Sequence, residues 1–241
     1  MRSLTRTILI TAALLFLPAP SLFAQAAADP SGHWEGTVDV PNMATKVGFD
    51  VAPNAKGVLA GTFNMPAENI KGLPLASVTV QGRSVTLLIK AGGAPSTFTG
   101  TLSDDGKTIA GTWSQSGQSA PFTLTRTGDA VFAAVPKSAA ISKEMVGTWT
   151  VALDFAGKPM RIVLTMANQP DGTATGTVMS PDGSGMDIAI VMTQKGSNLT
   201  VEVPTVGASF VGTLNAEGTE LAGTWTQVGM ALPLVFKRGA K

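Results

Sequence analysis

Apolar and polar residues alternate in short runs through most of the chain after residue 30, and Gly, Pro, Asn and Asp separate the runs. In the first run, Trp34, Gly36 and Val38 share one face, and His33 and Glu35 share the other. A period of two is typical of β-strands that bury one face. The first half of the chain predicts strands at 33–40, 46–52, 57–63, 73–81, 84–90, 96–103, 107–114 and 119–126, and the second half predicts eight matching ones.

The same unit occurs twice in the sequence. The stretch FTGTLSDDGKTIAGTW, which begins at Phe98, returns as FVGTLNAEGTELAGTW, which begins at Phe210. Internal similarity of this kind indicates two copies of one structural unit, each about 95–100 residues long. We therefore expect two domains, at residues 30–127 and 146–239, joined by a linker at residues 128–145.

The N-terminus has the features of a secretory signal peptide over residues 1–26. Arg2 and Arg6 flank the start of an apolar run at residues 8–17, and small residues lead up to Ala26. The run is too short to span a membrane, so we expect cleavage after Ala26 and a periplasmic or secreted protein. The chain contains no cysteine, which rules out disulfides and a lipoprotein-type signal.

Charge narrows the range of partners. After cleavage, fifteen basic and sixteen acidic residues remain, so the mature chain carries a formal net charge of −1. A nearly neutral surface does not favour nucleic-acid binding or docking to an anionic membrane. Tyrosine is absent, and the predicted strands are short for a membrane-spanning strand of about 9–11 residues. We expect neither nucleic-acid binding nor membrane insertion of the mature chain.

Short antiparallel strands of even spacing favour an all-β fold of two tandem eight-stranded antiparallel up-and-down barrels. A barrel is preferred because closure removes edge strands in an exported protein that has no disulfides. The Ala-rich linker predicts a short helix broken at Pro136. Glycines inside the predicted strands indicate bends, or close approach of a neighbouring group. These glycines are Gly61, Gly100, Gly111, Gly176, Gly212 and Gly223.

Each copy opens with Gly-x-Trp and ends with an arginine, so that Trp34 is matched with Arg126 and Trp149 with Arg238. This pairing resembles the structural signature of the calycin barrels, which include the lipocalins, fatty-acid-binding proteins and avidins. The resemblance implies a calycin-like barrel in which the arginine packs over the tryptophan of its own copy and closes the barrel.

A second resemblance rests on GTWSQSG, followed by Pro121 after three more residues, and on its counterpart GTWTQVG, followed by Pro233. These phrases resemble a β domain that precedes the α/β-hydrolase domain of some secreted bacterial serine hydrolases. The resemblance covers both copies and implies a structural or accessory role in an exported hydrolase system. The sequence ends at Lys241, where the catalytic domain would begin in those proteins, so we expect no hydrolase activity.

The residues that carry chemistry do not assemble a catalytic site. A Ser-His-Asp triad would need His33, the only histidine, which alternation places on the polar face and which the second copy replaces with Thr148. The nearest approach to a nucleophile elbow, at residues 117–121, lacks the final glycine. Asp50 lies between two apolar residues and is expected to point to solvent. We therefore expect a protein that is not an enzyme and has no metal site and no cofactor.

Tryptophan and glutamine residues at equivalent positions of the two copies are the remaining candidates for a functional role. Core packing is the main expectation for the tryptophans, and turn capping is favoured for the glutamines. If a barrel holds a ligand, these residues are the best lining candidates, because apolar pockets with a few polar groups are the usual small-molecule sites. The candidate ligand-binding residues are Trp34, Trp113, Gln115, Trp149, Trp225 and Gln227.

Three functions stay open on the sequence alone. The first is an exported non-catalytic β-barrel protein that binds a small apolar molecule or an exported protein partner. The second is an accessory module that docks to another exported protein through an apolar patch. The third is an inhibitor of an exported peptidase, acting through a projecting loop. An eight-stranded barrel either is filled by side chains or holds one small ligand, and the sequence does not decide between these outcomes.

Overall fold

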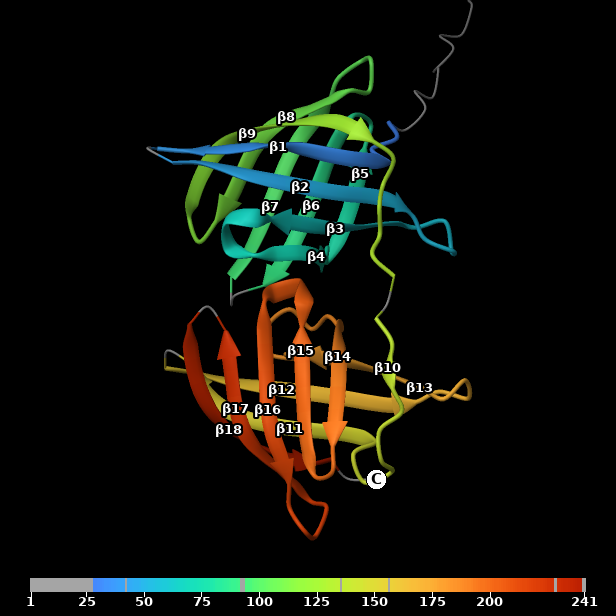
Figure 1. Ribbon diagram of the computed structural model, residues 1–241. Coiled ribbons are helices and arrows are strands. Elements are labelled where there is room, and N and C mark those ends of the chain that lie inside the picture. The colour runs from blue at the N-terminus through green and yellow to red at the C-terminus, as the bar shows by residue number, and fades with distance from the viewer. Residues whose placement is uncertain are drawn as a thin grey trace, which may run out of the picture.

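The computed structural model describes residues 28–41, 43–91, 94–134, 136–155, 157–227 and 229–239. The predicted signal peptide lies outside these ranges. The described residues form two β-sheet units, blue to green and yellow to red in Figure 1, and a connector runs down one side between them. The helical segments among them are two 3-10 turns, η1 (Pro66–Glu68) and η2 (Pro204–Val206). No described helix is long and apolar enough to cross a membrane.

The first unit is a nine-stranded antiparallel sheet with the strand order β4-β3-β2-β1-β9-β8-β7-β6-β5. Its strands are β1 (Gly32–Val40), β2 (Met43–Pro53), β3 (Leu59–Met65), β4 (Ile70–Pro74), β5 (Ser77–Gln81), β6 (Ser84–Ala91), β7 (Ala94–Leu102), β8 (Thr108–Gln115) and β9 (Gln118–Gly128). Each strand pairs with a strand that precedes or follows it directly in the chain, and β1 also pairs with β9, so that the first and last strands of the unit are joined.

The single strand predicted at residues 73–81 is wrong, because the chain changes partner in the middle of it. β4 pairs with β3, whereas β5 pairs with β6. At the step between them, Leu75 N–H donates to Gly61 O and Ala76 N–H donates to Leu88 O, both at 2.8 Å. The first unit is therefore a half-barrel whose two end strands follow one another directly along the chain.

The second unit is a closed barrel of eight strands in the order β13-β12-β11-β18-β17-β16-β15-β14, in which β14 also pairs with β13. The short strand β10 (Ser138–Ala139) adds to β13. The barrel strands are β11 (Gly147–Phe155), β12 (Lys158–Asn168), β13 (Thr173–Met179), β14 (Ile188–Lys195), β15 (Asn198–Val203), β16 (Ala208–Leu214), β17 (Glu220–Gln227) and β18 (Met230–Arg238). The prediction of two eight-stranded barrels is confirmed for this unit, and for the first unit only as an all-β half-barrel.

The predicted helix in the connector is also wrong. Its described residues contain β10, turns and extended chain. Val131 N–H donates to Asp50 Oδ1 at 2.8 Å, and Ile141 N–H donates to Asn168 Oδ1 at 3.0 Å. Side chains of the two sheets thus bind backbone groups that a helix would have used within itself.

Alternate inward residues of the strands build a core in each unit. In the first, the ring of Phe98 lies 4.9 Å from that of Phe49 and 5.2 Å from that of Phe122, in edge-on contacts. Ile188 and Val206, from β14 and η2 of the second unit, pack against both cores. The two units therefore share an apolar contact through η2, which faces the first unit in Figure 1.

Two of the in-strand glycines are required by close approach of a neighbouring strand, as predicted. A Cβ built on Gly111 would lie 2.0 Å from the carbonyl oxygen of Thr99, and one on Gly223 would lie 2.2 Å from that of Val211. Real Cβ atoms do not approach oxygen so closely, so only glycine fits at these crossings. Glycine therefore occupies this equivalent position in both copies.

The two units differ where their first and last strands meet. β1 pairs with β9 over six residue pairs, whereas β11 pairs with β18 over two, which are Trp149 with Arg238 and Thr150 with Lys237. Beyond Thr150 the register between β11 and β18 has no further pair among the described residues. We refer to the opening between Ala152–Phe155 of β11 and Met230–Val235 of β18 as the β11–β18 seam.

A single difference between the copies explains the seam. Gly36 and Val151 occupy the same position, two residues after the opening tryptophan. A Cβ built on Gly36 would lie 1.8 Å from the carbonyl oxygen of Thr123 on β9, so β1 and β9 approach one another only because residue 36 is glycine. Val151 has a side chain at this position, and we expect this side chain to keep β18 from following β11 along the same path.

We expect Gly36→Val to destabilise the first unit. The added side chain overlaps the backbone of β9, and overpacking of this kind typically costs about 1–3 kcal/mol. Urea unfolding of the mature protein measures the change. Thr99→Val, an exposed position on β7, is the matched control and should stay within about 0.5 kcal/mol of the wild type. An unchanged unfolding midpoint for Gly36→Val would refute the steric explanation.

The reverse substitution, Val151→Gly, should let β18 pair with β11 beyond Lys237. Hydrogen–deuterium exchange is the measurement, because amides that enter a ladder exchange more slowly. We expect new protection at Ala152 and Val235, even though loss of a buried valine lowers the overall stability. Exchange at both amides as fast as in the wild type would show that another contact keeps the strands apart.

Candidate functional site

Trp34 and Trp149 lie where the chain enters each unit, and both are fully buried. The indole Nε1–H of Trp34 donates to Pro30 O at 2.8 Å, and that of Trp149 donates to Met145 O at 2.9 Å. Buried tryptophans with satisfied nitrogens are typical of packing positions. Neither ring has exposed surface that a ligand can contact, so the geometry favours a structural role for this pair.

An arginine covers each of these tryptophans. The guanidinium carbon of Arg126 lies 4.7 Å from the centroid of the Trp34 ring, and that of Arg238 lies 4.3 Å from the Trp149 ring. This is the arrangement that the resemblance to the calycin barrels implies. The guanidinium groups also donate hydrogen bonds to backbone carbonyls, from Arg126 to Asp29 and from Arg238 to Val146 and Gly218.

Trp113 and Gln115 lie at the opposite end of the first unit, beside the β8–β9 hairpin, and both are half-buried. Trp113 Nε1–H donates to Ser96 Oγ at 2.6 Å, and Gln115 Nε2–H donates to Ala94 O at 3.3 Å. Their polar groups are therefore engaged by β7, the neighbouring strand. This end of the first unit is held together by its own side chains.

Trp225 and Gln227 occupy the matching positions in the second unit and are also half-buried. Gln227 pairs with Ala208 where Gln115 pairs with Ser96. The hydroxyl that receives the indole N–H in the first unit is thus replaced by a methyl group. The six sequence candidates therefore lie in two units and at two ends of each unit, and they do not converge on one site.

An inner-face leucine is exposed at the end of the second unit that holds Trp225. Leu232 pairs with Trp225 and alternates with the buried residues Leu234 and Phe236, so its side chain belongs to the inner face. It is nevertheless 39% exposed, whereas its counterpart in the first unit, Ala120, is 4% exposed. We attribute the difference in exposure to the β11–β18 seam, because β11 makes no ladder pair with the part of β18 that carries Leu232.

Other inward side chains meet at this end. β11 and β17 both run toward it, because each is antiparallel to β18. Leu153, Met160 and Trp225 are half-buried and pack against the upper part of the second core. We call the group of Leu153, Met160, Trp225, Gln227 and Leu232 the second-unit mouth. Below it the barrel is filled by fully buried side chains, among them Leu164, Phe210 and Phe236.

An ion pair supports the strand that carries Met160. Arg161 donates from Nε and Nη2 to the two carboxylate oxygens of Asp182 at 2.9 and 2.8 Å, and its backbone N–H donates to Oδ2 at 2.9 Å. Hydrogen bonds from Arg161 lower the pKa of Asp182, and the same contact raises the pKa of Arg161. The bidentate contact ties the turn after β13 to β12.

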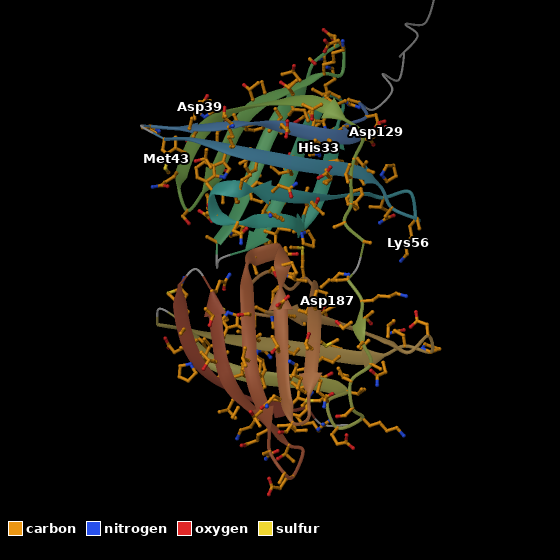
Figure 2. The ribbon with its side chains drawn as sticks, viewed as in Figure 1. His33, Asp39, Met43, Lys56, Asp129 and Asp187 are labelled. Atoms are coloured by element: carbon orange, nitrogen blue, oxygen red, sulfur yellow. The ribbon has the colours of Figure 1, made fainter. Side chains whose placement is uncertain are left out.

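Asp50 corrects the expectation of a solvent-exposed carboxylate. Alternation does point it outward, but the connector crosses over it, and Asp50 is 3% exposed. Its carboxylate accepts hydrogen bonds from His33 Nδ1 at 2.7 Å, Asn64 Nδ2 at 3.2 Å and Val131 N–H at 2.8 Å. Figure 2 shows His33 close to Asp129, where the connector leaves the first unit. This group fastens the connector to the first sheet.

The sequence held a signal for this polar group that the strand pattern alone does not reveal. His33, Asp50 and Asn64 correspond by register to Thr148, Thr165 and Met179 of the second copy. The imidazole, carboxylate and amide of the first copy are thus replaced by two hydroxyls and a thioether in the second. A difference of this kind indicates a contact that only the first copy makes. Here that contact is the connector.

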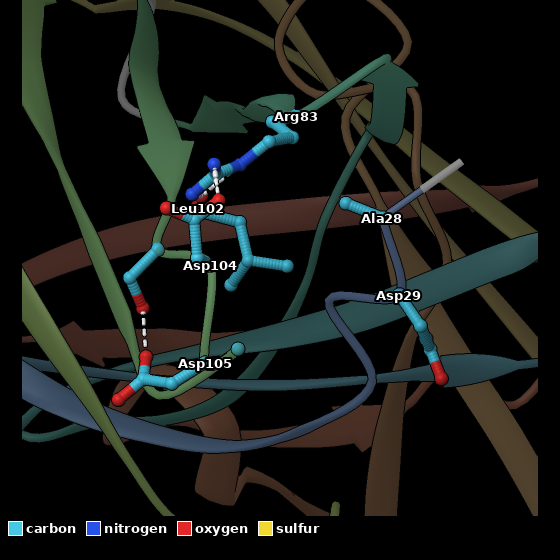
Figure 3. Close-up of a pocket in the computed structure, with 8 residues that line it drawn as sticks. Ala28, Asp29, Arg83, Leu102, Asp104 and Asp105 are labelled. Carbon is cyan, nitrogen blue, oxygen red and sulfur yellow. Dashed lines mark hydrogen bonds and ion pairs between the residues drawn. The ribbon is translucent and has the colours of Figure 1, made fainter. Parts of the chain in front are cut away.

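A surface hollow of about 320 Å³ lies at the entrance end of the first unit, where Arg83 reaches Leu102 and Asp104 (Figure 3). Its carboxylates are engaged locally. Asp105 Oδ1 accepts hydrogen bonds from Ser103 Oγ at 2.5 Å and Lys107 N–H at 3.0 Å, and these bonds lower the pKa of Asp105. The hollow is a tight turn stabilised by its own side chains, and it does not resemble a binding site.

In the part of the chain that the structure describes, no group of three or more His, Cys, Asp or Glu residues is placed to hold a metal ion. The described residues also give no positive evidence of catalysis. The imidazole of His33 contacts the carboxylates of Asp50 and Glu35, and among the described residues it contacts no hydroxyl group that could act as a nucleophile. The second-unit mouth is thus the site that the geometry supports best.

Comparison with known proteins adds little to this description. Neither a protein-family model nor a curated protein matches the chain. Among solved structures, a Bacteroides fragilis protein with a predicted outer-membrane assignment is 13% identical, with a TM-score of 0.28, over 87% of this chain and 98% of its own. A Nostoc punctiforme protein of unknown function from the DUF3598 family is also 13% identical, with a TM-score of 0.26, over 87% and 96%. Similarity at this level identifies neither fold family nor function, and the resemblance to the secreted hydrolases stays a prediction.

We expect Asp50→Ala to release the connector, because it leaves Val131 N–H without its acceptor. Loss of a buried hydrogen-bonding partner typically costs about 1–3 kcal/mol. Limited digestion with chymotrypsin is the measurement, since Phe132 lies in the connector and is 45% exposed. Cleavage should be faster in the variant and unchanged in Asp39→Ala, an exposed carboxylate on β1. Equal cleavage rates in the two variants would contradict the role given to Asp50.

Proposed function

We propose that the protein is an exported, non-catalytic binding protein whose second barrel holds a small apolar molecule at the second-unit mouth. The observation that carries the proposal is the 39% exposure of Leu232, a side chain of the inner face. Apolar side chains that line a concave opening gain free energy when an apolar ligand replaces water there. Export rests on the predicted signal peptide, and the periplasm or the medium is the proposed location.

The composition of the mouth supports a ligand that is apolar with one polar group. Leu153, Met160, Trp225 and Leu232 offer aliphatic, thioether and indole surface, and thioethers adapt readily to ligands of irregular shape. Gln227 contributes the single amide of the group. Because the barrel below is filled, the ligand would lie near the surface, and only part of it would be enclosed.

The first unit serves as a platform in this proposal. Its matching end is closed, with Val38 and Ala120 each 4% exposed, and Trp113 bonded to Ser96. We propose that both units are calycin-like barrels in tandem, and that the ligand site lies in the second. The difference between Gly36 and Val151 is then the difference between a filled barrel and one that binds.

The accessory and inhibitor alternatives have weaker support. Large exposed apolar side chains such as Met43 and Val58, at 65% and 59%, lie at separate hairpin turns of the first unit. Single exposed apolar residues such as these are normal on a protein surface, and they do not by themselves mark a docking patch.

The test is a fluorescence titration of the mature protein, residues 27–241, with the neutral apolar probe N-phenyl-1-naphthylamine. We expect saturable enhancement, and a loss of affinity of about tenfold or more for Leu232→Gln, because a buried leucine contact is worth about 1.5–3 kcal/mol. Trp225→Phe should weaken binding more than Trp113→Phe, its counterpart in the closed unit. Equal effects of the two tryptophan variants, or no saturable binding, would refute the mouth as the site.

Native mass spectrometry of the protein purified from its host identifies what it carries. We expect an additional mass that disappears on denaturation and that is absent from Leu232→Gln prepared in the same way. A bare mass at every charge state, together with a failed probe titration, would leave the proposal without support.

A further inference from the structure

The backbone of β11 faces the seam with hydrogen-bonding groups. In the β11–β12 hairpin, Phe155 is opposite Lys158, and the next pair joins Asp154 to Pro159, which has no N–H. Bonded and non-bonded pairs alternate in an antiparallel ladder. Asp154 and Ala152 therefore direct their N–H and C=O groups away from β12 and toward the seam, and both residues are exposed.

β18 offers a poorer edge to the same opening. Arg238 N–H donates to Thr219 O on the β17 side at 2.9 Å, so by alternation Val235 and Pro233 face the seam. Pro233 supplies a carbonyl but no N–H, which weakens this edge for strand pairing. Of the two edges, β11 is the one that can donate and accept at each successive seam-facing residue.

We propose that the β11–β18 seam binds one extended segment of a partner polypeptide, which adds as a strand beside β11. Donors and acceptors at this spacing are complementary to the backbone of another strand, which is the basis of strand addition in peptide recognition. An apolar small molecule leaves these groups unpaired. The inference therefore goes beyond the small-molecule function proposed for the mouth and rests on different atoms.

The position of β18 limits what kind of partner fits. The β11 edge carries exposed residues at Ala152 and Asp154, a stretch of about 10 Å of strand, and β18 is joined to β11 at Thr150. A strand already paired in a sheet would bring its neighbour into β18. The occupant is thus a flexible terminus or loop in extended conformation, with a bulky apolar residue directed inward toward Leu153 and Leu232.

A separate segment can also lie where β18 cannot. β18 is paired to β17 from Met230 to Lys237 and must therefore follow the course of that strand. A segment from another chain has no such constraint and can take the ordinary strand spacing of about 4.8 Å. The residue that opens the seam therefore does not block the proposed occupant.

The experiment uses the mature protein and, as an extended probe, a synthetic peptide with the sequence Phe122–Thr127, a part of the first-unit strand β9. Amide exchange is followed by NMR. We expect exchange at Ala152 and Asp154 to slow by about tenfold or more at saturating peptide. Leu153, whose amide already faces β12, serves as the internal reference and should not change.

Two N-methylated peptides provide a test that does not depend on the folding of a variant. One carries the methyl groups on the amides of Thr123 and Thr125, and the other on those of Leu124 and Arg126. Only alternate amides of an added strand bond to β11, so one peptide should lose binding and the other should keep it. Binding of both peptides alike, or of none including the parent, would overturn strand addition.

The Val151→Gly variant adds an independent check, because pairing of β18 with β11 should exclude the peptide. Protection of Ala152 and Asp154 without peptide, rising with protein concentration, would mean that a second copy is the occupant and would overturn the proposal. Trp225→Phe separates the two functions. It should weaken binding of the fluorescent probe and leave the peptide-induced protection of Asp154 in place, so that either function can fail alone.

Discussion

The meeting of the first and last strand decides the character of each unit. The paired residues of these strands lie more than eighty positions apart in the sequence, as His33 with Gly128 and Thr150 with Lys237 illustrate. In both copies a tryptophan and an arginine fix the start of this pairing. The length of the ladder then depends on the next inward position, where glycine permits six pairs and valine stops the ladder after two. We attribute the difference between the two ladders to that one steric constraint.

Much of the fold could be predicted from the sequence, because strands with one buried face leave a period of two in the chain. The repeat and most strand positions belong to this part, whereas the stacking of Arg126 on Trp34 was implied by the resemblance to the calycin barrels. The partner change between Pro74 and Ser77 could not be predicted, since both halves of that run have the same alternation. Only the three-dimensional course of β3 and β6 decides which half pairs with which strand.

The candidate site was predictable in part. The sequence pointed to Trp225 and Gln227, but it weighted Trp34 and Trp149 equally, because burial depth is not visible in alternation. It also placed Asp50 in solvent, since outward-facing means exposed only where nothing crosses the sheet. Leu232 was missed altogether, because an apolar residue on the inner face of a strand normally signals core. The contrast between Gly36 and Val151 was the available clue, and its meaning depends on how close β9 lies to β1.

The seam also has a meaning for how such a chain folds. Joining strands so distant in sequence carries a large loop-closure entropy, and contacts of this kind form late. In the first unit, six residue pairs of the final ladder offset that entropy. In the second unit, the ladder between β11 and β18 ends after two pairs, at Trp149 and Thr150. In its native state, the first and last strands of the second unit are thus held together mainly where Trp149 and Arg238 meet.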